Sequence, residues 1–221
     1  IKIPSAKGST RTHRVIGSVT SENGGIVEWQ HGLELVERAF HRGHQIGYVP
    51  LVAGTSYIEI ARAAVYATSK ARPFKIDSTV FHTFLFIDGD FSDIRLRTTM
   101  VCQTNVVAIA SQRDEESGWT NHTEMRAYLH ELARSLTLGN ANIRQPSRRV
   151  QREDFYSAIG NNYQGEFRMA QESWVGPEQH VLSRIEFEHL SVEPFLRACA
   201  WLDSCNHTAV LMSQLSVNAT S

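Results

Sequence analysis

The chain has 221 residues, of which 42% are hydrophobic and 20% are charged. This is the composition of a globular protein that can bury a core without disulfides or metals. The formal net charge of −1 indicates no basic face for nucleic acid, and no apolar run approaches the roughly 20 residues that cross a bilayer. The three cysteines, Cys102, Cys199 and Cys205, are odd in number, which argues against a disulfide framework and for a reducing compartment. We therefore expect a cytoplasmic protein without a nucleic-acid or membrane partner.

The first half of the chain predicts one buried helix and several strands. Residues 1–12 are polar and basic and are interpreted as an arm. From Thr55 apolar residues recur every three or four positions, which predicts a helix with a wide apolar face, with Gly54 and Thr55 as its turn and N-cap. Alternating patterns predict strands over residues 24–36, 75–87, 93–103, 105–112 and 118–130. A single helix wrapped by a curved sheet fits this order.

The second half repeats the plan in shorter form. Residues 139–153 are polar and rich in turn-forming residues and arginine, which indicates a linker between a first domain over 13–138 and a second over 154–221. Within the second domain the patterns predict a short helix over 154–159, strands over 167–176 and 180–190, and a helix over 193–212 with Pro194 in its first turn. Almost no strand pattern follows this last helix, and the chain starts with Ile rather than Met. We therefore expect a second half that is incomplete in this sequence.

Two places in the sequence could carry acid–base chemistry. His44 stands just before the buried helix. Asp203 and His207 are four residues apart, so they share a face of the last helix, and Leu196 and Cys199 on the same face predict that it points inward. A carboxyl group on an inward apolar face is costly unless it is paired or protonated, so Asp203 is either a satisfied core residue in a simple helical pair or a functional acid. Removing water across a carbon–carbon bond needs a base beside a carbonyl and an acid for the leaving hydroxyl.

The motifs around these residues resemble those of a known family. Residues 44–57 read H-Q-I-G-Y-V-P-L-V-A-G-T-S-Y and resemble H-x-x-x-G-x-x-x-x-P, followed by G-x-x-Y and a helix, in the dehydratase domains of polyketide synthases and animal-type fatty acid synthases. Residues 160–167, G-N-N-Y-Q-G-E-F, are similar to the family's G-x-x-Y-x-G-x-F. Residues 202–207, L-D-S-C-N-H, match L-D-x-x-x-Q/H. The resemblance covers about residues 13–212, with every motif in family order.

The resemblance implies an α+β double hotdog, in which two long helices are each wrapped by an antiparallel sheet, with the second hotdog incomplete here. It implies a hydro-lyase that removes water from a β-hydroxyacyl thioester to give an α,β-enoyl thioester in polyketide or fatty acid biosynthesis. The substrate would arrive on the phosphopantetheine arm of an acyl carrier protein, with no cofactor of the domain's own and no metal. Neighbouring synthase domains and a second copy in a homodimer are the other partners implied.

The resemblance also implies roles for particular residues. His44 would be the base that removes the α-proton, Asp203 the acid that protonates the leaving hydroxyl, and His207 the residue that orients Asp203. Tyr163 and Gly165 would help to shape the pocket.

Other positions in the first motif either match the family or depart from it. Gly54 and Tyr57 match. Tyr48 stands where the family has glycine and could narrow the tunnel, and Ala53 stands where it has a proline that stiffens the turn. Gly43 replaces the aspartate that commonly precedes the histidine.

Three alternatives remain open at this point. The altered first motif favours a catalytically degenerate dehydratase-like domain with a structural role in a megasynthase. A double-hotdog isomerase or cyclase could use the same His/Asp pair. A metal site at His41-x-x-His44 would need a third ligand that the sequence does not supply. The remaining histidines, including His82, His122 and His130, are interpreted as scattered strand and surface residues.

Overall fold

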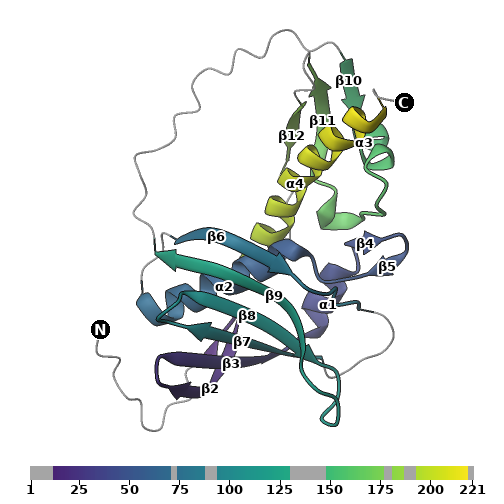
Figure 1. The fold of residues 1–221 in the computed structure, drawn as a ribbon. Coiled ribbons are helices and arrows are strands. Elements are labelled where there is room, and N and C mark those ends of the chain that lie inside the picture. The colour runs from purple at the N-terminus through teal and green to yellow at the C-terminus, as the bar shows by residue number, and fades with distance from the viewer. Residues whose placement is uncertain are drawn as a thin grey trace. The chain divides into compact units, whose positions relative to one another are not determined.

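The computed structural model describes residues 12–70, 74–87, 94–129, 148–176, 181–186 and 193–218. The chain divides into two compact units (Figure 1), the first from the described residues of 1–33, 60–84 and 91–131, the second from those of 34–59, 85–90 and 132–221. The second unit thus joins a segment of the N-terminal half to the C-terminal half. The predicted domains at 13–138 and 154–221 remain a prediction, and most of the predicted linker lies outside the described residues.

The first unit contains an antiparallel sheet with the strand order β1-β2-β3-β7-β8-β9-β6. Side chains along β7 alternate between buried and half-buried, with Leu96, Thr98 and Met100 facing the core, as expected for a strand with one covered face. The strands are β1 (Thr12–His13), β2 (Gly17–Asn23), β3 (Ile26–Gly32), β6 (Phe74–Phe81), β7 (Arg95–Val101), β8 (Val106–Gln112) and β9 (Thr120–Leu129).

Helix α2 (Gly54–Ser69) begins in the second unit and passes into the first at Ile60. Its later part lies along one face of the sheet (Figure 1), where the Thr68 hydroxyl lies 3.4 Å from the Met100 sulfur. Ala61, Ala64 and Val65 on this part are buried. The predicted wide apolar face of this helix is therefore confirmed.

The second unit holds the other long helix. Helix α4 (Pro194–Asn218) packs against β12 of a three-stranded antiparallel sheet with the order β10-β11-β12, and α3 packs against β11 (Figure 1). Phe155, Phe167 and Leu196 are fully buried in the core of this unit. The remaining elements are β10 (Arg148–Gln151), α3 (Arg152–Ala158), the 3-10 helix η1 (Gly165–Phe167), β11 (Ala170–Val175), β12 (Val181–Ile185), α1 (Leu35–His41) and the hairpin β4 (Gln45–Ile46) with β5 (Val49–Pro50).

Several predicted element bounds were wrong. The strand expected over 24–36 ends at Gly32, and α1 follows it, because the backbone N–H of Glu34 donates 2.8 Å to Glu37 Oε2 and caps a helix. Residues 82–87 are not part of β6, and η1 occupies the start of the strand expected at 167. Thr55 lies inside the first turn of α2 rather than at its N-cap, since the helix begins at Gly54.

Of the strand expected over 180–190, β12 covers Val181–Ile185, and residues 180 and 187–190 lie outside the described ones. His122, interpreted as one of the scattered strand and surface residues, lies on strand β9, where it is buried. Its two ring nitrogens lie 2.7 Å from Ser111 Oγ and 3.0 Å from the Thr83 carbonyl oxygen.

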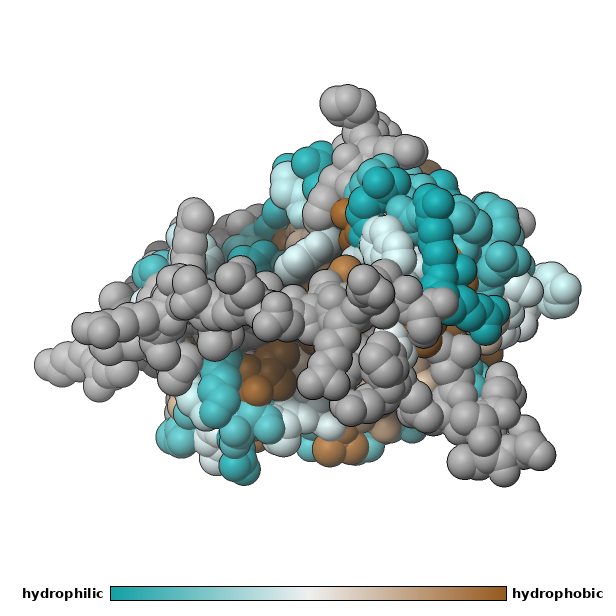
Figure 2. Space-filling view, turned by 90° about the horizontal axis from the view of Figure 1, so that it is seen from above, coloured by the Kyte–Doolittle hydropathy of each residue, from teal (hydrophilic) through white to brown (hydrophobic). Residues whose placement is uncertain are grey.

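On the face seen in Figure 2, hydrophobic side chains of the described residues lie in separate patches among polar ones. The part of the chain that the structure describes has no helix long and apolar enough to cross a membrane. Cys102, Cys199 and Cys205 are all free.

Candidate active site

His44 is held by a tight turn at the end of α1. The helix closes with the Arg42 N–H bonded to the Arg38 carbonyl, and the next two N–H groups, of Gly43 and His44, donate to the carbonyls of Phe40 and His41 at 3.1 and 2.9 Å. The His44 carbonyl in turn accepts a hydrogen bond from the Leu51 N–H at 3.0 Å, across the base of the β4–β5 hairpin. Backbone bonds on both sides therefore fix the position of this histidine.

Asp203 and His207 lie on the buried face of α4, as predicted. Leu196 and Cys199 on the same face are fully buried, and the exposed fractions of Asp203 and His207 are 7% and 1%. Cys199 is buried beside Ser56, and burial raises the pKa of its thiol to about 12, so the thiol is protonated at neutral pH. It is a core residue rather than a nucleophile.

The structure brings His44, Asp203 and His207 together around one carboxylate oxygen. His44 Nε2 lies 3.6 Å from Asp203 Oδ2, and His207 Nε2 lies 2.8 Å from the same oxygen. The side chains of His44 and Asp203 are each 9% exposed. All three residues belong to the second unit. Residues from the N-terminal and C-terminal halves of the sequence therefore meet within one compact body.

Polar atoms in this cluster lack well-formed hydrogen bonds. Within the described residues, His44 Nδ1, Asp203 Oδ2 and both ring nitrogens of His207 are buried without a hydrogen bond of good geometry. The 2.8 Å approach of His207 to Asp203 is therefore a close polar contact with poor alignment. Because buried polar groups in proteins are nearly always hydrogen-bonded, this concentration of unbonded atoms makes the cluster a candidate functional site.

Burial sets the protonation of the histidines. Burial lowers the pKa of His44, the nearby Asp203 carboxylate raises it, and His207 lowers it again. Burial also lowers the pKa of His41 to about 3, with a smaller contribution from His44. Both imidazoles are therefore neutral near pH 7, and a neutral imidazole can accept a proton.

The segment 160–167 supplies an aromatic wall. Positive φ angles of 77° at Gly160 and 53° at Gly165 explain the two glycines of this motif, since other residues rarely adopt that backbone conformation. The ring centroid of Tyr163 lies 3.9 Å from that of His207 and 5.3 Å from that of His44. The ring of the fully buried Phe167 packs edge-on against His44, with 5.1 Å between the ring centroids. This segment therefore touches both histidines at once.

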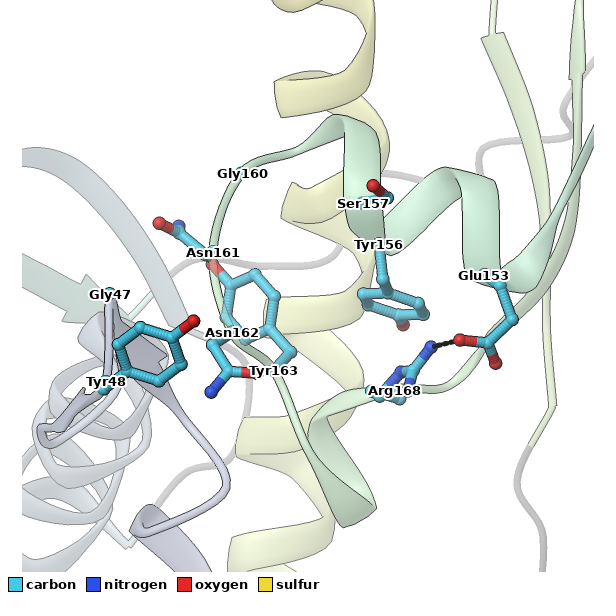
Figure 3. Close-up of a pocket in the computed structure, with 10 residues that line it drawn as sticks. All are labelled: Gly47, Tyr48, Glu153, Tyr156, Ser157, Gly160, Asn161, Asn162, Tyr163 and Arg168. Carbon is cyan, nitrogen blue, oxygen red and sulfur yellow. Dashed lines mark hydrogen bonds and ion pairs between the residues drawn. The ribbon is translucent and has the colours of Figure 1, made fainter.

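Tyr163 also lines a hollow of about 500 Å³ (Figure 3). In Figure 3 Tyr48 lies on one side of it and the ion pair between Arg168 and Glu153 on the other, with Tyr163 between them. The hollow is lined by Gly47, Tyr48, Glu153, Tyr156, Ser157, Gly160, Asn161, Asn162, Tyr163 and Arg168. Tyr163 therefore connects this open polar hollow to the buried cluster.

The other predicted residues occupy varied positions. Tyr48 is 88% exposed at the tip of the β4–β5 hairpin, where the preceding residue, Gly47, has a positive φ of 61°. Gly54 is the first residue of α2, and Tyr57 is buried one turn later. Ala53 is fully buried in the core of the second unit.

Sequence reasoning missed several residues of the site. Asn161 Nδ2 donates to the Tyr163 hydroxyl at 2.9 Å, and Asn162 Nδ2 donates to Gln45 Oε1 at 2.8 Å. His41, whose ring contacts those of Phe40 and Phe167, was considered only as a metal ligand. Among the described residues no group of three or more His, Cys, Asp or Glu side chains could hold a metal ion.

Residues 13–112 match the family model of the polyketide synthase dehydratase domain. This range includes His44 but not Tyr163 or Asp203. Comparison with curated proteins gave no match.

Solved dehydratase domains share the fold. The CurJ dehydratase, as an inactive mutant in complex with a compound, superposes with a TM-score of 0.77 at 16% identity over 93% of this chain and 73% of that one. The CurF dehydratase domain of curacin polyketide synthase superposes with a TM-score of 0.75 at 17% identity, over 90% of this chain and 76% of that one. The PpsC dehydratase domain from Mycobacterium tuberculosis superposes with a TM-score of 0.75 at 18% identity, over 93% of this chain and 77% of that one. The chain therefore has the α+β double-hotdog fold of these domains, and the coverage of about three quarters fits the predicted incomplete second hotdog. The resemblance to polyketide synthase dehydratase domains is confirmed.

Proposed function

We propose that this chain is a dehydratase that converts a β-hydroxyacyl thioester into an α,β-enoyl thioester. The observation that carries the proposal is the buried pair of His44 Nε2 and Asp203 Oδ2, 3.6 Å apart. An acid and a base so close together can act on adjacent carbons of one substrate, and holding them in place supplies much of the rate.

The proton balance of the reaction assigns a role to each group. Neutral His44 removes the α-proton, and the electrons of that C–H bond form the new double bond. The carboxyl group of Asp203 acts as the acid and donates a proton to the departing β-hydroxyl, which leaves as water. His207 Nε2 lies 2.8 Å from Asp203 Oδ2, and we infer that His207 acts as a positioning residue for this carboxyl group.

The route of the substrate follows from the aromatic wall. Tyr163 borders both the hollow and the histidines, and Gly165 gives the backbone its turn there. We infer that the acyl chain, carried on the phosphopantetheine arm of an acyl carrier protein within a synthase module in the cytoplasm, passes this wall. Tyr48, exposed at the rim of the hollow, would contact the chain or its carrier. Gly54 and Tyr57 would hold the start of α2 beneath the site.

Variants of the solved relatives support these roles. The inactive CurJ mutant has phenylalanine in place of a histidine, and the inactive CurK mutant has asparagine in place of an aspartate. One residue of each type is what the proposal requires of His44 and Asp203.

The experiment is a mass-spectrometric assay for loss of water from a β-hydroxyacyl thioester on a carrier-protein mimic. His44→Ala and Asp203→Asn are compared with His82→Ala and Asp154→Asn, which alter the same residue types at partly or fully exposed positions. We expect turnover in the parent and both controls, and a loss of about 10²-fold or more in each site variant.

Two other outcomes would contradict the proposal. A folded parent that never releases water from a range of acyl lengths would favour the structural, degenerate domain. A parent that leaves the β-hydroxyacyl thioester intact but moves the double bond of an added enoyl thioester would identify an isomerase.

A further inference from the structure

The turn that carries His44 and the aromatic segment that carries Tyr163 meet backbone to backbone. The Gln164 N–H donates to the Gly43 carbonyl at 2.8 Å. Two residues after Gly43 and two residues before Gln164, a second bond joins the segments, because Asn162 Nδ2 donates to Gln45 Oε1 at 2.8 Å. These two hydrogen bonds flank His44 on either side, and together they form what we call the Gly43–Gln164 clasp.

The clasp leaves no room for a side chain at position 43. A Cβ atom on Gly43 would lie 2.6 Å from the Gln164 carbonyl oxygen and 3.3 Å from the Phe167 ring. The nearest obstacle is backbone, which cannot rotate away as a flexible side chain would. Gly43 does not adopt a positive φ, so close approach rather than backbone conformation explains the glycine.

The consequence reaches the candidate active site. Tyr163 and Phe167, on either side of Gln164, pack against the His44 ring at 5.3 and 5.1 Å. Any shift of Gln164 therefore moves both walls of the histidine. A shift on the other side of the clasp moves His44 relative to Asp203.

We propose that Gly43 is a positioning residue for His44, and that its lack of a side chain lets the clasp hold the imidazole against the Tyr163–Phe167 wall within reach of Asp203. The aspartate that commonly precedes the family's histidine would not fit this chain's clasp, because its Cβ would meet the Gln164 carbonyl oxygen. The catalytic part of this inference rests on the proposed dehydratase function. Its structural part does not.

The test compares Gly43→Ala with Gly118→Ala, since a Cβ at Gly118 would meet nothing within 4 Å. The full chain is labelled with ¹³C-histidine, and the His44 signal is identified by its absence in His44→Gln and titrated by NMR. The titratable groups around His44 are Asp203 and His207 from α4, His41 from α1 and Tyr163. Because burial is the main cause of the lowered His44 pKa, a loosened clasp should raise that pKa toward its ordinary value of 6.5.

We expect Gly43→Ala to shift the His44 signal and its titration, and to lower kcat by about 10- to 100-fold with KM within about twofold. Gly118→Ala should match the parent in each measurement. A folded Gly43→Ala variant with an unchanged His44 titration would overturn the proposal. If Gly43→Ala does not fold, the same NMR measurement is made on Asn162→Ala, which removes only the second hydrogen bond of the clasp. A displaced His44 signal supports positioning, and an undisplaced one overturns it.

The NMR readout separates this inference from the proposed function. A parent without dehydratase activity, but with a His44 titration that responds to Gly43→Ala, would refute the function and leave the positioning role standing. Activity in the parent with no response of His44 would do the reverse.

Discussion

The two units each bury histidine, and they do so in opposite ways. In the first unit, His122 on β9 lies between Ser111 Oγ and the Thr83 carbonyl, at 2.7 and 3.0 Å, so each ring nitrogen has a partner. In the second unit, both nitrogens of His207 and Nδ1 of His44 have no well-formed hydrogen bond among the described residues. The carbonyl at Nδ1 fixes the His122 tautomer, so that Nε2 accepts the serine proton.

This is the difference that we expect between a structural histidine and a histidine with the proposed role in chemistry. A buried ring with both nitrogens bonded gains stability and has nothing left to offer a substrate. A buried ring with unmade bonds costs stability, since each unsatisfied group forfeits about 1–3 kcal/mol. Such a cost is typical of sites whose partner arrives with the ligand.

The largest expected effect is on the stability of the first unit. His122→Ala should lower the free energy of unfolding by about 2–4 kcal/mol, because it leaves a cavity and strands Ser111 and the Thr83 carbonyl. His44→Ala should cost about 1 kcal/mol, since it removes packing but no well-formed side-chain hydrogen bond. Urea unfolding followed by circular dichroism measures both. Equal losses in the two variants would refute the distinction between the two kinds of histidine.

Acid should affect the second unit through His41. Its pKa is about 3 in the folded chain and near 6.5 when unfolded, so below pH 6.5 the unfolded state binds a proton that the folded state does not. The contribution of neutral His41 to the free energy of unfolding is fully present above pH 6.5. It falls by about 1.4 kcal/mol per pH unit as the pH drops from 6.5 toward 3. His41→Phe should reduce the slope of unfolding free energy against pH between pH 3 and 6.5 by the amount that corresponds to one bound proton. Phe40→Leu, which alters the same aromatic cluster without a titratable group, should keep the parent's slope.

The predictable part of this fold is the part where periodicity and burial agree. The apolar face of α2 and the inward face of α4, with Asp203 and His207 on it, follow from spacing alone. Helix α1 was missed, because seven residues with exposed Leu35 and Val36 carry no clear helical pattern and the cap at Glu34 is a local hydrogen bond. Local bonding of this kind is not visible in apolar spacing.

The missing parts of the candidate site are contacts between segments distant in sequence. Asn162 bonds to Gln45 and Gln164 to Gly43, more than a hundred residues apart along the chain. Motif spacing identified His44 and Asp203 separately but gave no way to measure the gap between them. The role of Gly43 depends on a backbone approach that only the folded chain reveals.

A smaller effect on stability is expected when His207, one of the histidines without a well-formed hydrogen bond, is replaced. His207→Phe keeps the ring packing on Tyr163 and removes two unsatisfied nitrogens, so stability should hold or rise by about 1 kcal/mol. Asp203 would lose its close polar contact, and kcat should fall by about tenfold with KM unchanged. His207→Gln, the family's other residue at this place, should restore turnover because its amide can donate to Asp203. Failure of glutamine to rescue, with a folded protein, would argue against a positioning role.

The smallest effect is expected at the Tyr163 hydroxyl, where the distinction between bonded and unbonded groups can be tested within the candidate site. The Tyr163 hydroxyl has a partner, because Asn161 Nδ2 donates to it at 2.9 Å. By the distinction drawn between the histidines, a satisfied group of this kind supports the fold rather than the reaction. Asn161→Ala should therefore cost about 0.5–1.5 kcal/mol of unfolding free energy and leave kcat within about twofold. Burial is the main cause of the raised Tyr163 pKa, and the Asn161 hydrogen bond partly offsets it, so the variant should also push tyrosine ionisation to higher pH. If Asn161→Ala instead abolished turnover while leaving stability intact, a bonded hydroxyl would be part of the chemistry, and satisfaction of hydrogen bonds would not separate structural from functional groups in this unit.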